Sequence, residues 1–197
     1  MGNKEEIGIE KLTIKAKVLL MLLSSQHCLS FLKERPSLVF DIEEVMEING
    51  WFLQSFENIV KWLEGYSIEG EIFYKEFIYS KVANYNGYYN HYQQPKESDA
   101  YNCCLSTLYF SCKSIMMFSN KDYNKFPSDI AEVTDNTVIR CLIFSQQASL
   151  DPELEKQWQE RVLDRLLKDH LEKELDEFGS TISRHYINDL LGQKLPF

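Results

Sequence analysis

The sequence predicts an all-α protein, a single-domain helical bundle of about six to seven helices with a long C-terminal amphipathic helix. Apolar residues recur at intervals of three and four in several long segments, as one buried helix face requires. Helix start and stop signals flank most of these segments, and strand-like composition is confined to one of them. With 197 residues and 44% hydrophobic content, the chain suffices for one domain over residues 1–197.

Residues 4–34 are predicted to form the first helix, which ends at Arg35 because the residue before Pro36 disfavours helical dihedral angles. Two lysines precede the apolar run from Val18 to Leu23, but this run is too short for the core of a signal peptide. No segment approaches the roughly 20 apolar residues that a membrane span requires. We therefore expect a cytoplasmic protein with a buried first helix and no membrane partner.

A second helix is predicted from Asp41, which forms a capping box with Glu44, to Gly65, which ends it. Residues 71–82 are rich in β-branched and aromatic side chains without clean alternation, so a helix is favoured over a strand. Residues 84–97 lack apolar periodicity and are dense in Tyr, Asn and Gln, which predicts a loop or an insertion.

The next predicted helix is capped by Ser98 or Asp99 and is apolar on nearly all sides. A helix of this kind belongs at the centre of a bundle. Another helix is predicted to begin near Ser128 and Asp129, where Glu132 completes a capping box.

The long C-terminal helix is predicted over residues 151–179, which carry a start signal, an apolar stripe and a stop signal in one run. Asp151 is the expected N-cap, Pro152 suits the first helical position, and Gly179 supplies a left-handed C-cap. A short helix over residues 181–191 follows. The apolar stripe comprises Leu154, Trp158, Val162, Leu166, Leu167, Leu171, Leu175 and Phe178.

Five cysteines occur in apolar surroundings, with neither paired Cys-x-x-Cys units nor a suitably spaced pair of histidines. This pattern indicates free buried thiols in a reducing compartment. The cysteines are Cys28, Cys103, Cys104, Cys112 and Cys141.

No motif for a reaction, a metal or a cofactor is found in the sequence. It has no His-Glu-x-x-His, no Gly-x-Ser-x-Gly and no glycine-rich phosphate loop. None of its 4 histidines has a glutamate three residues before it, as a di-iron bundle requires. We therefore expect no catalytic residue, no metal site and no cofactor, and favour a non-enzymatic role.

Residues 130–167 resemble the YjaG-like bacterial family, catalogued as domain of unknown function 416. The resemblance lies in the Glu-Val step at Glu132, the polar linker after it, and a long helix bearing Glu155 and Trp158 in Glu-x-x-Trp spacing. The chain departs from the family at Leu105, where the family tends to carry a polar residue, and in its longer Tyr/Asn insertion. The resemblance implies an all-helical fold and no established activity.

The net charge of −9 predicts that the protein repels nucleic acid and attracts basic partners. The Tyr, Asn and Gln of residues 84–97 suit the recognition of another protein. We expect an acidic protein-binding protein, an immunity or antitoxin-like protein that neutralises a basic bacterial toxin, and the sequence leaves a homodimer open. The predicted partner-binding residues are Tyr85, Tyr88, Tyr89, His91, Tyr92 and Asp99.

The alternative is an enzyme or a small-molecule binder of unrecognised type, with a polar pocket between helices. On the long helix, His170 with Glu174 and Glu172 with Asp176 are spaced as two ligands or an acid and a base, although a solvated charged surface explains such pairs as well. The candidate pocket residues are Glu155, Asp164, His170 and His185.

Overall fold

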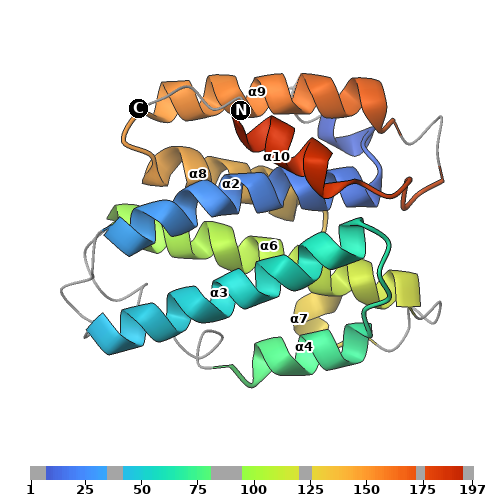
Figure 1. Ribbon diagram of the computed structural model, residues 1–197, viewed down its shortest axis with the longest axis horizontal. Coiled ribbons are helices and arrows are strands. Elements are labelled where there is room, and N and C mark those ends of the chain that lie inside the picture. The colour runs from blue at the N-terminus through green and yellow to red at the C-terminus, as the bar shows by residue number, and fades with distance from the viewer. Residues whose placement is uncertain (1–7, 35–41, 81–94, 120–125, 172–175, 193–197) are drawn as a thin grey trace.

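The computed structural model describes residues 8–34, 42–80, 95–119, 126–171 and 176–192 (Figure 1). Over these residues the protein is all-α, which confirms the predicted fold class, and the β pairing found there is an isolated bridge between Leu12 and Leu171. The helices are α2 (Ile14–Glu34), α3 (Ile42–Leu63), α4 (Gly70–Ile78), α6 (Pro95–Ser119), α7 (Ser128–Ala131), α8 (Asp135–Ala148), α9 (Pro152–Asp169) and α10 (Arg184–Gly192).

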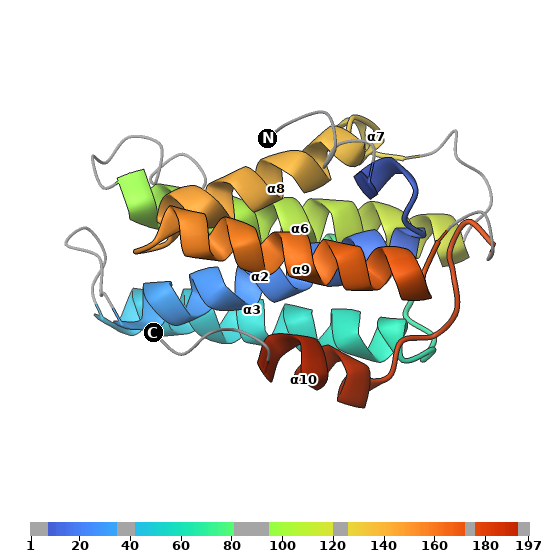
Figure 2. The same ribbon diagram turned by 90° about the horizontal axis from the view of Figure 1, so that it is seen from above.

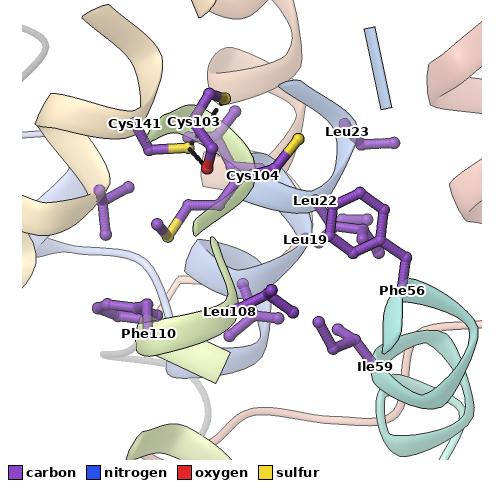
Figure 3. Packing of buried hydrophobic residues seen from close by; sticks show 14 of the residues in the cluster. Leu19, Leu22, Leu23, Phe56, Ile59, Cys103, Cys104, Leu108, Phe110 and Cys141 are labelled. Atoms are coloured by element: carbon purple, nitrogen blue, oxygen red, sulfur yellow. Dashed lines mark hydrogen bonds between the residues drawn. The ribbon is translucent and has the colours of Figure 1, made fainter. Parts of the chain in front are cut away.

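Helices α2 and α6 form the centre of the bundle, with α9 on one side and α3 and α4 on the other (Figure 1). Seen from above, α8 and α10 lie on opposite sides of α9 (Figure 2). Leu19 and Leu22 of α2 meet Phe56 and Ile59 of α3 and Leu108 of α6 (Figure 3). Because α6 carries buried side chains on nearly all sides, it packs against α2, α3, α4, α7 and α8. The predicted central position of this helix and the burial of the first one are confirmed.

The first helix begins later than the predicted residue 4, because the backbone around Leu12 pairs with a distant segment. The N–H of Thr13 donates to the carbonyl of His170 at 3.2 Å, and the N–H of Ile14 donates to that of Glu177 at 2.9 Å. A further bond joins Lys15 N–H to the carbonyl of Phe178. These acceptors satisfy N–H groups that the first turn of any helix leaves unpaired, so the C-terminal segment caps α2.

The long C-terminal helix was predicted to reach Gly179, and this prediction is wrong: α9 ends at Asp169. Its start is as predicted, since the Asp151 carboxylate accepts the N–H of Leu154 at 3.0 Å and Pro152 takes the first position. His170 and Leu171 leave the helix, because the His170 carbonyl accepts the N–H of Thr13 and Leu171 forms the bridge with Leu12. Gly179 has the expected positive φ of 81°, but it closes a turn against Thr13.

The helix expected from Ser128 and Asp129 is divided in the structure into α7 and α8. Thr134 is the N-cap of α8 in place of a box between Asp129 and Glu132, and its N–H donates to Thr137 Oγ1 at 3.2 Å. The ammonium of Lys113 on α6 binds the carbonyls of Ala131 and Val133. These carbonyls are thereby satisfied outside a helix, which stabilises the break.

Other predicted boundaries differ in their outcome. Gly65 ends α3 with a φ of 98°, as predicted, whereas the box of Asp41 and Glu44 lies outside the described side chains. Residues 71–78 are helical, as favoured. Helix α6 begins at Pro95, because proline suits the first helical position, and not at Ser98 or Asp99. The predicted loop over residues 84–97 is therefore wrong for residues 95–97, and its remainder lies outside the described residues. The last helix begins at Arg184, later than the predicted residue 181.

Candidate functional site

The predicted partner-binding residues are placed by the structure only in part. Tyr85, Tyr88, Tyr89, His91 and Tyr92 lie outside the described residues. The sixth, Asp99, lies in the second turn of α6, where it is half-buried. Burial raises the pKa of the Asp99 carboxyl because the charged form loses hydration.

The outer side of α4 and the residues that flank it form an exposed surface, which comes before residues 85–92 in the sequence. Glu69, Ile72, Glu76 and Tyr79, termed the α4 face, are spaced so that they share one side of the helix. Ile72 is 51% exposed and Tyr79 is 83% exposed. Neither Glu69 nor Glu76 has an ion-pair partner among the described residues. The α4 face therefore combines solvent-exposed apolar surface with two carboxylates that no cation in the described part of the chain pairs with.

The inner face of α4 fixes this helix to the bundle. Phe77 is buried and packs its ring against Trp51 of α3 and Tyr109 of α6, with centroids 5.9 and 4.7 Å away. The Tyr74 hydroxyl donates to the Asp129 carboxylate at 3.1 Å. Burial and the nearby Asp129 raise the pKa of Tyr74 to about 12, so this hydroxyl stays protonated. The α4 face is thus presented on a firmly packed helix.

A network termed the buried polar cluster, made of His27, Ser145, Glu155 and Gln159, joins α2, α8 and α9. The Glu155 carboxylate accepts the Ser145 hydroxyl at 2.7 Å and the Gln159 amide at 3.3 Å. Nδ1 of His27 lies 3.2 Å from the same carboxylate, and the His27 ring packs on Trp158 with centroids 4.2 Å apart. The sequence analysis names Glu155 but not its partners, because His27 is 128 residues away in the chain and its contact depends on the packing of α2 against α9. Its carboxylate is engaged in holding helices together.

The remaining pocket candidates are not brought together with Glu155. Asp164 and His185 are exposed, and His170 lies beyond the end of α9. His170 was expected to share a helix face with Glu174, but the helix ends before it, and Glu172 and Glu174 lie outside the described residues.

The five cysteines are free and buried, as predicted. The sulfurs of Cys103 and Cys141 lie 3.5 Å apart at the junction of α6 and α8 (Figure 3). Burial raises the pKa of the Cys103 and Cys104 thiols, because a thiolate would lose its hydration there. Within the described parts of the chain, no group of three or more metal-ligating side chains is arranged to hold an ion.

A cavity of about 520 Å³ lies where the end of α3, the end of α9 and the start of α10 meet. The Tyr186 ring contacts the His170 ring edge to face, with centroids 5.6 Å apart, and its hydroxyl donates to Asp169 at 2.8 Å. Polar side chains dominate the lining: Glu64, Tyr66, His170, Thr181, Ser183 and Tyr186.

One imidazole nitrogen of this cavity residue is unsatisfied. His170 is only 8% exposed, and its Nδ1 has no hydrogen-bond partner among the described residues. Burial lowers the pKa of His170, so the imidazole is neutral at pH 7. A buried nitrogen without a partner is costly and is rare in native proteins.

Known proteins give no further guide to the site: no family model, curated protein or solved structure matches the chain. The resemblance to the YjaG-like family therefore stays a prediction. In the described residues, every helix is too short or too polar to cross a bilayer.

Proposed function

We propose that the protein is a non-enzymatic, acidic protein-binding protein of the immunity or antitoxin type, which neutralises a basic bacterial toxin. The observation that carries the proposal is the α4 face, where the exposed Ile72 and Tyr79 alternate with the exposed Glu69 and Glu76 along one side of the helix. Exposed apolar side chains framed by one sign of charge are typical of a surface that docks an oppositely charged protein.

The charge of the whole molecule supports the same partner class. A net charge of −9 produces a field that speeds the encounter with a cationic protein and slows the approach of nucleic acid. The predicted partner-binding residues Tyr85 to Tyr92 follow Tyr79 closely in the sequence. We propose that they also contact the partner, because tyrosine rings make rigid contacts.

The alternative of an enzyme has less support. Among the candidate residues, Glu155 has its carboxylate engaged by neighbouring helices, whereas Asp164 and His185 are exposed and separate from it. A general acid or base must reach a substrate atom, and a saturated carboxylate between helices is poorly placed for that.

The test is neutralisation of a basic toxin encoded beside this gene, in bacteria that express both proteins. We expect the wild-type protein to restore growth and to form a stable complex in size-exclusion chromatography. The double variant Ile72→Ser and Tyr79→Ala is expected to lose protection, whereas Leu150→Ala, which removes an equally exposed apolar side chain elsewhere, is expected to protect normally. Absence of both protection and complex with the wild-type protein would refute the proposal.

A further inference from the structure

We propose that the cavity between the end of α3 and the start of α10 binds a neutral polyhydroxyl ligand, a free sugar or the terminal sugar of a glycan. The inference is independent of toxin binding. The cavity volume of about 520 Å³ lies within the range of roughly 300 to 1,000 Å³ that small-molecule sites occupy.

The lining offers what a sugar needs. Thr181, Ser183 and Tyr66 each carry a hydroxyl, which both donates and accepts hydrogen bonds. The rings of Tyr66 and Tyr186 add aromatic surface, whose negative face attracts the polarised C–H groups of a sugar ring. A ligand with hydroxyls on its edge and C–H groups on its faces matches both features.

The charges at the cavity disfavour an anion. Glu64 is the acidic residue among the lining residues, and the Arg184 guanidinium binds it at 3.1 Å while also binding Glu57 at 2.7 Å. One guanidinium between two carboxylates leaves one negative charge in excess, which repels an anion. His170 is neutral because burial lowers its pKa. The side chains of Thr181 and Ser183 in the lining are uncharged hydroxyls, which suit a neutral ligand.

His170 provides the second, independent observation. Its Nδ1 is buried without a hydrogen-bond partner among the described residues, at a residue that lines the cavity. A hydroxyl is suited to such a nitrogen, because it donates to an imidazole acceptor and accepts from an imidazole donor. The nitrogen is itself covered in the structure, so the proposal includes a turn of the His170 ring that brings it to the ligand hydroxyl.

The experiment is an NMR titration of the full chain, labelled with ¹⁵N, against defined probes. The neutral probes are D-glucose, D-galactose, N-acetyl-D-glucosamine, maltose and chitobiose, and the charged probes are choline and inorganic phosphate. We expect saturable shifts at the amides of Tyr66, Ser183 and Tyr186 with a neutral sugar. Binding of a monosaccharide identifies a free sugar as the ligand, whereas binding of disaccharides alone identifies a glycan end.

Two variants test whether the sugar binds in this cavity. Tyr66→Ala removes an aromatic wall and is expected to weaken sugar binding about fivefold. Thr181→Val keeps the shape that packs on Gly65, removes a hydroxyl, and is expected to weaken binding by a similar factor. The matched control is Tyr79→Ala, another exposed tyrosine on the separate α4 face, which should bind as the wild type does.

The proposal is overturned if no neutral sugar produces saturable shifts at these amides. Saturable binding of choline or phosphate in place of the sugars would overturn it as well, and so would equal losses in Tyr66→Ala and Tyr79→Ala. Failure of the sugar titration leaves toxin neutralisation untouched, because that assay depends on the α4 face.

Discussion

The buried polar cluster and the α4 face place carboxylates in opposite surroundings. The Glu155 carboxylate lies between three helices and receives hydrogen bonds from Ser145 and Gln159. The carboxylates of Glu69 and Glu76 face solvent beside exposed apolar side chains and have no ion-pair partner among the described residues. Among the described residues, the first carboxylate has hydrogen-bond partners and the other two have no ion-pair partner. The position of Glu155 is explained by its contribution to the stability of the fold. The exposed carboxylates of the α4 face do not contribute in that way, and we propose that they serve to bind a partner.

The largest expected effect comes from removing the anchor that holds the α4 face in place. Phe77→Ala deletes a buried ring that contacts Trp51 and Tyr109, so we expect a loss of about 3 to 5 kcal/mol in the free energy of unfolding. Chemical denaturation followed by circular dichroism measures this loss. A loss below about 1 kcal/mol would show that α4 is not packed as described.

The next largest effect tests the buried polar cluster directly. Glu155→Ala leaves the Ser145 hydroxyl and the Gln159 amide without their acceptor, which we expect to cost about 2 to 3 kcal/mol. Glu155→Gln retains an acceptor oxygen and should cost less. If both variants unfold at the wild-type denaturant concentration, the cluster does not hold the helices together.

A smaller effect on the free energy of unfolding is expected from His170, and this effect depends on pH. Burial lowers the pKa of His170 in the folded protein below its ordinary value of 6.5, so the unfolded chain binds its proton first as the pH falls. Stability is therefore expected to be unaffected by His170 above about pH 7 and to decrease as the pH drops below 6.5. His170→Gln removes this titration. Thermal unfolding of both proteins from pH 7.5 to 5 should show the shallower slope in the variant, and identical slopes would contradict the prediction.

The smallest change in stability is expected on the α4 face itself. Reversing the charge in Glu69→Lys and Glu76→Lys should alter the free energy of unfolding by less than about 0.5 kcal/mol, because both side chains are exposed. The association rate with a basic toxin should nevertheless fall about tenfold at low salt, as stopped-flow mixing would measure. A rate that responds neither to the substitution nor to salt would separate the α4 face from partner capture.

Local signals explain which parts of the fold were predictable. Gly65 ends α3 and Asp151 begins α9 because a cap depends on residues within one turn of it. Gly179 has equally suitable local chemistry, yet α9 ends at Asp169, because the pairing of Leu12 with Leu171 involves a distant part of the chain. Spacing within one helix contains no information about such a contact.

The candidate sites were less predictable for the same reason. His170 and Glu155 were both singled out from the sequence, but Glu155 belongs to the buried polar cluster and His170 to a separate cavity. Glu155 is contacted by His27 of α2, and His170 is contacted by Tyr186 of α10. The sequence gives no sign of either contact, because both involve other helices. The sequence does not identify the α4 face, because the composition of residues 71–82 distinguishes only a helix from a strand. Which side of that helix is exposed depends on the packing of Phe77.

The capping of α2 by the carbonyls of His170, Glu177 and Phe178 has a consequence for biosynthesis. The ribosome must synthesise the chain as far as Phe178 before the N–H groups at the start of α2 can reach their final acceptors. Until then water must take the place of these carbonyls, so this end of α2 is completed late in synthesis.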